Sequence, residues 1–384
     1  MRAVPMNPNV ATGAIYADNA ATTRLSERAY ESMLPFMRED FGNPSQPYAF
    51  ARSTKRAIRA ARETVARCVN AEPNEIFFTS GGTESDNWAI KGFALRDASQ
   101  KVLATSEIEH HAVLNSVDAM RVIGHRTHLL SVDTDGTLDL AAAEGVDFGG
   151  NGLLSLMFAN NEIGTLQPVK QACDIAHNRG AYFHTDAVQA VGHVPIDVKE
   201  LGVDMLSASA HKFNGPRGIG FLYVKNGTLL SSYASGGAQE MGHRAGTENT
   251  AAIVGLATAL EENCGQMSEN AARLRSLEDE LLSRLGAAQL DFRRNGTNQL
   301  PGLLSLSFRN ASGEMLLHRL DLMKICVSTG SACDGANTQI SHVLKAIDIK
   351  DDYALGTIRV SLGRDSTSKD ARSIAAGIIK ILSM

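Results

Sequence analysis

Short apolar runs alternate with helical patterns from about residue 75 to residue 225 of this chain. Runs of this kind, bounded by glycines and polar residues, are typical of buried strands. They occupy residues 75–79, 101–105, 153–158, 181–185 and 205–209. Because strands that alternate with helices usually pair in parallel, the pattern predicts an α/β fold with a mainly parallel sheet flanked by helices.

The pattern changes after residue 247. A long helical stretch covers about residues 247–285, and shorter strand and helix patterns follow it. We therefore expect a large domain over residues 15–260 and a smaller α+β domain over residues 261–384, against which the segment of about residues 15–30 can pack. Residues 1–14, which contain two prolines and no apolar core, are expected to form a loose N-terminal extension.

The composition excludes several classes of protein. The chain has 384 residues, of which 43% are hydrophobic and 21% charged, as in an ordinary globular protein. Its net charge of −5 is spread without a long run of one sign, so the sequence indicates neither a nucleic-acid nor a membrane surface. With no apolar segment of membrane-spanning length and no secretory signal, we expect a cytoplasmic protein that binds small molecules and other proteins. Five cysteines without regular spacing favour reduced thiols over a disulfide framework.

Lys212 lies between two apolar runs that are predicted to be strands. A small-residue turn and His211 precede it, and a glycine-punctuated loop follows it. A lysine held in such a tight connection is suited to Schiff-base chemistry, because desolvation lowers the pKa of the ammonium group and frees the amine. The alternative is a surface lysine in a loop between strands.

Residues 80–85 (SGGTES) lie between a predicted strand and a predicted helix. Glycines allow the backbone to approach a ligand closely, and the free N–H groups at the start of a helix attract anions. The segment therefore predicts a phosphate site, although an ordinary turn with a helix cap remains the alternative. It is not a Walker loop, because no Gly-Lys-Ser/Thr follows it.

Asp186 follows the strand at residues 181–185, at the edge where α/β sheets bind ligands. A carboxylate there could keep a pyridinium nitrogen protonated, whereas an aspartate that merely caps a turn is the alternative. His110 and His111 follow the strand at residues 101–105, and an imidazole at this edge could stack on a cofactor ring or transfer protons. A solvent-exposed histidine pair is the alternative. A metal site is not indicated, because no cysteine or third histidine stands at ligand spacing.

An anion loop, an amine, a carboxylate and an imidazole at one sheet edge describe a pyridoxal 5′-phosphate site. The sequence also resembles the cysteine desulfurases of the NifS/IscS type, which are fold-type I pyridoxal-phosphate enzymes. The match runs from about residue 15 to the C-terminus in the expected order. The resemblance rests on residues 18–23 (DNAATT), 80–87 (SGGTESDN), 109–112 (EHHA), 160–164 (NNEIG), 184–189 (HTDAVQ), 211–212 (HK), 244–249 (RAGTEN) and 328–333 (STGSAC).

The resemblance implies a role for each matching position. Lys212 would form the Schiff base with the cofactor and His110 would stack on its ring. Asp186 would bind the ring nitrogen and Gln189 the phenolic oxygen. The phosphate would be held by Gly82, Thr83, Ser209 and His211, and by Thr247 reaching across a homodimer. Arg359, helped by Asn161, would grip the substrate carboxylate, for which a planar guanidinium is well suited.

Cys333 distinguishes this interpretation from an ordinary aminotransferase. It lies among small and turn-forming residues, which predict an exposed loop. The other cysteines lie on or near apolar stripes or runs and are expected to be core or partly buried thiols: Cys68, Cys173, Cys264 and Cys326. Because the neighbouring Asp334 disfavours the thiolate, we expect Cys333 to be activated only when its loop enters the cationic site.

The reaction implied is the conversion of L-cysteine to L-alanine. Lys212, once displaced by the substrate, would remove the Cα proton, and the Cys333 thiolate would attack the substrate sulfur. The persulfide on Cys333 would then pass to an acceptor protein. His110 is a candidate for protonating the leaving carbon or deprotonating the substrate thiol.

Other functions stay open at this point. A selenocysteine lyase or an aminotransferase would keep Lys212 and Asp186, and a sulfur-delivery scaffold would bind an acceptor with little turnover. A metal-binding thiol protein is the weakest alternative, because paired-cysteine spacing is lacking. Iron–sulfur cluster assembly, RNA thiolation and DNA sulfur modification are all pathways that draw on similar enzymes. Two residues depart from the family pattern: Ala238 replaces a usual glycine and Met241 a common arginine.

Overall fold

The computed structural model describes residues 13–329 and 340–383. The predicted α/β fold with a mainly parallel sheet is confirmed. The large sheet has seven strands in the order β2-β8-β7-β6-β5-β3-β4, in which β7, β6, β5, β3 and β4 are parallel and β8 runs antiparallel to both neighbours. In chain order its strands are β2 (Ile76–Thr79), β3 (Val102–Ser106), β4 (Arg126–Leu130), β5 (Gly152–Ser155), β6 (Ala181–Asp186), β7 (Met205–Ser209) and β8 (Gly220–Val224).

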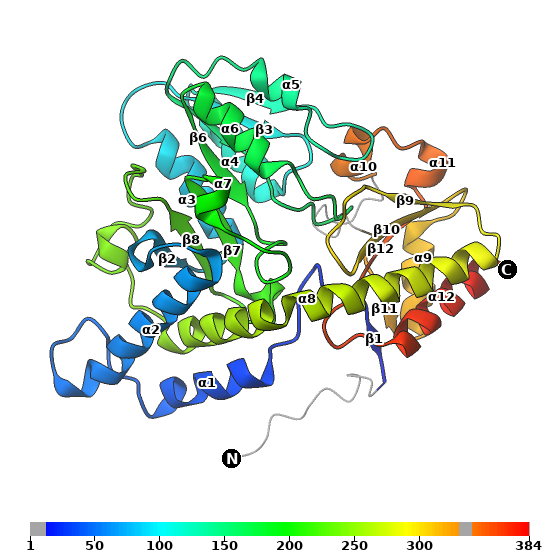
Figure 1. Cartoon of the computed structure of the whole chain (residues 1–384), viewed down its shortest axis with the longest axis horizontal. Coiled ribbons are helices and arrows are strands. Elements are labelled where there is room, and N and C mark those ends of the chain that lie inside the picture. The colour runs from blue at the N-terminus through cyan, green and yellow to red at the C-terminus, as the bar shows by residue number, and fades with distance from the viewer. Residues whose placement is uncertain (1–12, 330–339, 384) are drawn as a thin grey trace.

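Helices cover both faces of this sheet (Figure 1). The helices of this part of the chain are α1 (Glu27–Arg38), α2 (Arg52–Val69), α3 (Gly82–Ala94), α4 (His111–Val122), α5 (Leu140–Glu144), α6 (Val169–Asn178) and α7 (Val198–Leu201). Apolar residues of α3 and α4 pack on one face, and those of α2 and α6 pack on the other. Because both faces are covered, most of the strands are buried along their whole length, which explains their continuous apolar runs.

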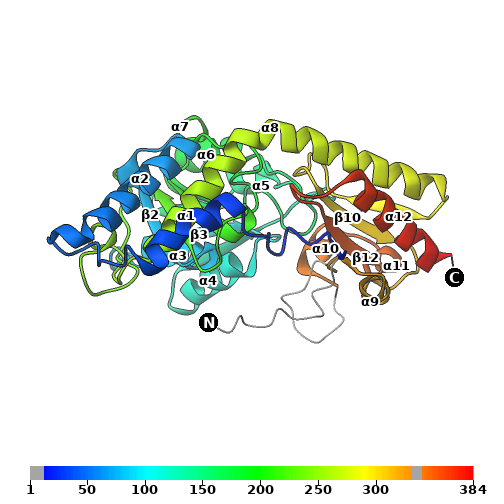
Figure 2. The same cartoon turned by 90° about the horizontal axis from the view of Figure 1, so that it is seen from below.

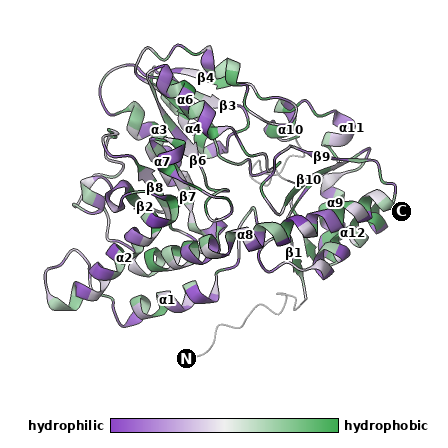
Figure 3. Cartoon of the chain, viewed as in Figure 1, coloured by the Kyte–Doolittle hydropathy of each residue, from purple (hydrophilic) through white to green (hydrophobic). Residues whose placement is uncertain are grey.

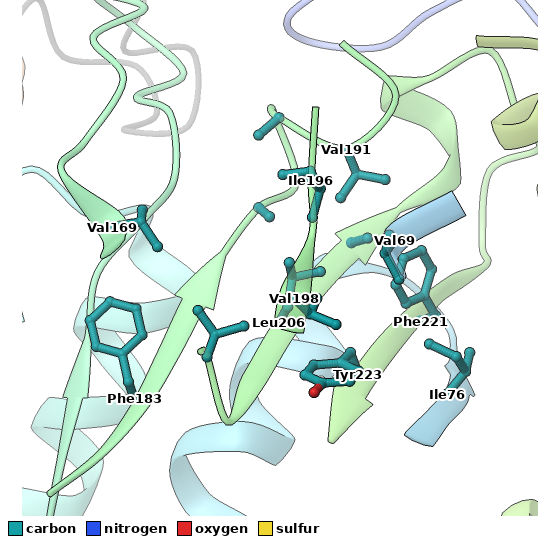
Figure 4. Packing of buried hydrophobic residues seen from close by; sticks show 14 of the residues in the cluster. Val69, Ile76, Val169, Phe183, Val191, Ile196, Val198, Leu206, Phe221 and Tyr223 are labelled. Carbon is teal, nitrogen blue, oxygen red and sulfur yellow. The ribbon is translucent and has the colours of Figure 1, made fainter. Parts of the chain in front are cut away.

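Alternate residues of each strand enter the two apolar layers. In β8, for example, Phe221 and Tyr223 belong to one layer and Leu222 to the other. Figure 4 shows Phe221, Tyr223 and Leu206 packed with Ile76 and Val69 in the first of these layers. The sheet is therefore a rigid platform, and the polar residues at its strand ends are held in fixed positions.

A second apolar core surrounds a three-stranded antiparallel sheet with the order β12-β10-β9. The elements that follow residue 290 are β9 (Phe292–Asn295), β10 (Leu303–Phe308), α9 (Gly313–Leu322), β11 (Ile325–Cys326), α10 (His342–Ala346), α11 (Asp351–Ala354), β12 (Thr357–Ser361) and α12 (Ser368–Leu382). Of these, α10 and α11 pack in a smaller apolar cluster that includes Ile108 and Met157 of the large part. The N-terminal strand β1 (Ile15–Tyr16) pairs in parallel with β11.

Helix α8 (Thr250–Ala287) is 38 residues long and joins the two cores. Its first half packs in the large core and its second half in the small one. Figure 2 shows it running without a break above both parts. Green segments face the interior of each part in Figure 3, in keeping with two apolar cores. A domain boundary near residue 260 therefore falls inside a continuous helix, and the division at this residue stays a prediction.

Candidate active site

A cavity of about 260 Å³ lies at the carboxyl ends of the parallel strands. The structure brings together there most of the residues predicted from the sequence, which come from segments far apart in the chain. The predicted residues that line it are Gly82, Thr83, His110, Asn161, Asp186, Gln189, Ser209, His211, Lys212 and Arg359. A shared site requires this proximity.

Lys212 lies in the short connection between β7 and β8, as its sequence context predicts. Its Nζ donates hydrogen bonds to the carbonyl oxygens of Ala20 and Ala21, at 2.5 and 3.0 Å. The same Ala20 oxygen accepts a hydrogen bond from Gln189 Nε2 at 3.0 Å. Two main-chain carbonyls therefore hold the amine at the cavity wall, and a Schiff base with a carbonyl compound would require Nζ to exchange these contacts.

The start of α3 forms one end of the cavity. Gly81 has φ +148°, and a Cβ added to Gly82 would come within 2.5 Å of Val188 Cγ2, so both positions favour glycine for physical reasons. The first N–H groups of a helix have no partner within the helix, and with the helix dipole they favour an anion. Thr83 lies in the same first turn. This end of the cavity can therefore hold a phosphate.

His211 and Arg217 border a second, more open hollow that continues from the start of α3. Burial, together with the positive charges of Lys212 and Arg217, lowers the pKa of His211 to about 4. Its imidazole is therefore neutral near pH 7 and can donate one N–H to a phosphate oxygen. Arg217 was not predicted from the sequence as a site residue, and its guanidinium adds positive charge to this region.

Asp186 is the last residue of β6 and is 6% exposed. It accepts a hydrogen bond from the backbone N–H of Val188 at 2.9 Å. Burial raises the pKa of its carboxyl group, whereas His110, Val188 and Lys212 act in the opposite direction. A cationic ring nitrogen placed beside Asp186 would favour the ionised carboxylate further, which is the behaviour expected of a pyridinium partner.

His110 caps the N-terminus of α4. Its Nδ1 accepts a hydrogen bond from the backbone N–H of Ala112 at 3.1 Å. Burial, with the charge of Lys212 acting in the same direction, lowers its pKa despite the opposing effect of Asp186. The ring is therefore neutral and oriented, with the proton on Nε2. A neutral ring fixed in this way can both stack on a flat ligand and exchange a proton through Nε2.

Arg359 lies in β12 and is 4% exposed. Its Nη1 donates to the backbone oxygen of Asn161 at 2.8 Å, and its Nη2 pairs with Asp18 Oδ1 at 2.8 Å. Its Nε is buried without a hydrogen-bond partner among the described residues. Asp18 and the Asn161 carbonyl thus orient the guanidinium at the cavity, and sequence reasoning missed the role of Asp18 because no pattern links it to Arg359.

Several cavity residues were not singled out from the sequence. They include Ala20, Ala21, Asp86, Met157 and Val188. The alanines contribute main-chain oxygens, which no sequence pattern reveals. Asp86 had a recognisable signal, because it is a charged residue one helical turn after Gly82 in a helix that is otherwise largely buried.

The donors in this cavity fit pyridoxal phosphate. The cofactor has an aldehyde, a phosphate, a basic ring nitrogen and a flat ring. The cavity supplies a primary amine at Lys212, a helix N-terminus at Gly82, a carboxyl group at Asp186 and an imidazole at His110.

Thr247 lies outside the cavity, on an exposed segment before α8. The same segment contains the two departures from the family pattern. Ala238 does not have positive φ, so its methyl group causes no backbone strain, whereas Met241 takes φ 56° and is 51% exposed. Arg244 ties the segment to the start of α3 through an ion pair with Glu84 at 2.9 Å.

Cys333 falls outside the described residues. Of the other cysteines, Cys173 is buried, and Cys68, Cys264 and Cys326 are partly buried. Within residues 13–329 and 340–383, no group of three or more histidine, cysteine or acidic side chains could hold a metal ion.

Comparisons with known proteins agree with this site. Residues 15–374 match the aminotransferase class-V family. Cysteine desulfurase IscS of Clostridium botulinum (strain Hall) is 44% identical over 96% of this chain and 94% of its own. A solved NifS-like protein superposes with a TM-score of 0.90 at 36% identity, covering 97% of this chain and 100% of that one. A solved complex of SspA with cysteine gives a TM-score of 0.81 at 34% identity, covering 92% of this chain and 100% of that one.

These findings confirm the resemblance predicted from the sequence motifs and the pyridoxal phosphate cofactor. They extend over nearly the whole chain, including both apolar cores. The chain belongs to the aminotransferase class-V family and is related within it to the cysteine desulfurases.

Proposed function

We propose that this protein is a pyridoxal-phosphate-dependent cysteine desulfurase, which converts L-cysteine to L-alanine and takes up the sulfur as a persulfide on Cys333. The observation that carries the proposal is the joint presence of Lys212, Asp186 and Arg359 in one cavity. The activity is supported by 44% identity to a cysteine desulfurase over nearly the whole chain. The persulfide on Cys333 rests on the sequence motif at residues 328–333.

Bound pyridoxal phosphate supplies an electron-poor ring that stabilises negative charge on the substrate Cα. Asp186 would keep the ring nitrogen protonated, and Gln189 would donate its amide N–H to the phenolic oxygen. The phosphate would be bound by Gly82, Thr83, Ser209 and His211. His110 would stack on the ring and exclude water from it.

Lys212 serves both as the attachment point of the cofactor and as the base for the Cα proton. The carbonyl oxygens of Ala20 and Ala21, to which Nζ donates hydrogen bonds, would hold the protonated amine after it has taken the Cα proton. His110, neutral and protonated on Nε2, is the nearby group that can exchange a proton with the substrate thiol or the departing carbon.

Arg359 binds the substrate carboxylate, for which its buried position and its free Nε are suited. Arg359→Lys keeps the charge but removes the planar fork, so we expect KM for cysteine to rise about tenfold or more, the effect of losing one charge-assisted hydrogen bond. Steady-state kinetics measure the KM for cysteine. Arg309→Lys, at an exposed surface position, is the matched control and should leave KM unchanged. An unaltered KM in Arg359→Lys would remove this residue from the substrate site.

The experiment that tests the function supplies the protein with pyridoxal phosphate and L-cysteine, with no keto acid. Alanine should form in step with sulfide released by a thiol reductant. An aminotransferase would need a keto acid, and a delivery scaffold would produce neither product in more than one equivalent. A parallel assay with selenocysteine distinguishes a cysteine desulfurase from a selenocysteine lyase, because the lyase would prefer selenocysteine to cysteine.

We also propose that the protein acts as a homodimer. Large apolar side chains are exposed on α1 and just after it, which is typical of a protein interface. They are Tyr30, Leu34, Met37, Phe41, Tyr48 and Phe50. Thr247, which is exposed in the single chain, would bind the cofactor phosphate of the partner subunit.

Thr247→Val removes the hydroxyl while keeping the shape of the side chain. We expect cofactor affinity to fall about tenfold through the loss of a hydrogen bond to a charged group, with the dimer intact. Fluorescence titration of the cofactor-free protein measures the affinity, and analytical ultracentrifugation measures the dimer. A monomer that binds the cofactor as tightly as the unsubstituted protein would contradict the proposed role.

The sulfur acceptor is proposed to be another protein, and iron–sulfur cluster assembly is one route that the sulfur could take.

Within the described part of the chain, no helix has the length and apolar character needed to cross a bilayer. A cytoplasmic location stays a proposal.

A further inference from the structure

Asp86 is a buried acid group that the mechanism above does not use. It lies in α3, about one helical turn after Gly82, and is 1% exposed. It lines the cavity together with Asp186. Its Oδ1 is fully buried and has no hydrogen-bond partner among the described residues. An ionised carboxylate at this position would therefore carry an oxygen that nothing stabilises, which is costly in a protein interior.

The groups that face Asp86 come from β6, from β7 and from the turn between β3 and α4. His184 in β6 is the nearest basic side chain, with Nε2 3.7 Å from Asp86 Oδ1. Its two ring nitrogens already bond to Ser155 Oγ at 2.8 Å and Ser207 Oγ at 2.9 Å, and burial lowers its pKa to about 3. The imidazole is therefore neutral and brings no positive charge to Asp86.

The other groups facing Asp86 are acids. Burial raises the pKa of Asp86 well above its usual value, and the nearby Asp186 and Glu109 raise it further, opposed only by a hydrogen bond with Ser207. Glu109 is itself fully buried, and burial raises its pKa to about 8. Like charges this close in a buried site are not all ionised together.

The two cavity acids are not equivalent. Asp186 accepts the Val188 N–H at 2.9 Å and is faced by Lys212 and His110, both of which favour its ionised form. For Asp86, the group that favours the ionised form is the hydroxyl of Ser207. A single negative charge on this pair of acids is therefore more stable on Asp186 than on Asp86.

We propose that Asp86 is held as a neutral carboxylic acid and acts as a positioning residue, which confines the negative charge of the pair to Asp186. The consequence for the cofactor rests on the proposed function, in which Asp186 faces the ring nitrogen. A neutral Asp86 fills the space beside Asp186 without adding charge, so the ring nitrogen meets a single carboxylate. The electron-withdrawing power of the ring then depends on Asp186 alone.

The first test uses cofactor-free protein, so that it does not depend on the function. The infrared spectrum near pH 7 should contain the band of a buried protonated carboxylic acid, and Asp86→Asn should remove it. A second band from Glu109 should remain. Asp118→Asn, at an exposed position of α4, is the matched control and should leave both bands unchanged. If Asp86→Asn removes only carboxylate absorption, Asp86 is ionised and the proposal is wrong.

The second test uses the protein loaded with pyridoxal phosphate and follows the pH titration of its absorbance. Asp86→Asn, which preserves a neutral hydrogen-bonding group, should leave the midpoint where it is in the unsubstituted protein. Asp86→Ala opens the site to water and should shift the midpoint. Asp86→Asn, which refills the space, should restore the midpoint of the unsubstituted protein. If the midpoint of the absorbance titration falls by about one pH unit or more in Asp86→Asn, the proposal is wrong, because a fall of this size is expected when a neighbouring negative charge is removed.

The two tests also separate this inference from the proposed function. A protein that acquires no absorbance band with pyridoxal phosphate would contradict the function, while the infrared comparison would still decide the charge of Asp86. A correct function with an ionised Asp86 would contradict the inference alone.

Discussion

Replacing Lys212 by alanine should abolish alanine formation from cysteine. In the proposed mechanism Lys212 both attaches the cofactor and removes the Cα proton, so we expect turnover to fall at least about a thousandfold, as for loss of a catalytic base. The absorbance band of the protein-bound Schiff base should disappear, and borohydride should no longer fix the cofactor to the chain. Both changes follow from one side chain because Lys212 lies at the wall of the same cavity as Asp186 and His110.

Two variants sharpen this result. Lys212→Arg keeps a positive charge at the same place but cannot form the Schiff base, so it should be as inactive as the alanine variant. Lys199→Ala removes an exposed lysine that pairs with Glu72 and should retain full activity. Normal turnover in either Lys212 variant would show that the amine is not the reacting group and that another residue attaches the cofactor.

Replacing Cys333 by alanine should stop sulfur transfer while leaving the cofactor in place. In the proposed reaction the Cys333 thiolate receives the sulfur, and the sequence of residues 328–339 contains no second cysteine, so we expect sulfide release to fall at least about a thousandfold. The absorbance band should be unchanged, because cofactor attachment depends on Lys212 and the sheet edge. Mass spectrometry after addition of cysteine should find one extra sulfur atom on the unsubstituted chain and none on the variant.

Cys264→Ala is the matched control, because it removes a partly buried thiol of α8 that belongs to the large core. It should keep sulfide release and the mass increase. Persistent turnover in Cys333→Ala, or a persulfide found on another cysteine, would show that the sulfur follows a different route. The pair of experiments on Lys212 and Cys333 thus separates attachment of the cofactor from transfer of sulfur.

Much of the fold could be predicted because buried strands carry a strong local signal. The runs in β2, β3, β5, β6 and β7 are largely apolar and almost entirely buried, since the sheet is covered on both faces. Strand β4 was not identified, because it pairs only with β3, lies at the edge of the sheet and exposes most of its residues. Its polar sequence, Arg-Thr-His-Leu-Leu, therefore contains no buried run.

The cavity residues likewise include some that could be predicted from the sequence and some that could not. Lys212, Asp186 and His110 lie at the end of a strand or shortly after it, so their place at one sheet edge could be expected from the order of the elements. The ion pair between Asp18 and Arg359 could not, because these residues are 341 positions apart and meet only through the packing of the N-terminal segment on β12. The Ala20 and Ala21 carbonyls are main-chain groups, which any residue would supply.

The sequence by itself determined the α/β class, the cofactor and the family, because these depend on local periodicity and on short motifs whose chemistry does not need coordinates. Only the tertiary structure decided which charges face one another. It placed Asp18 against Arg359, the Ala20 and Ala21 carbonyls against Lys212, and Asp86 beside Asp186. The physical reason is that the protonation state and orientation of a buried group depend on its neighbours in space, and those neighbours come from distant parts of the chain.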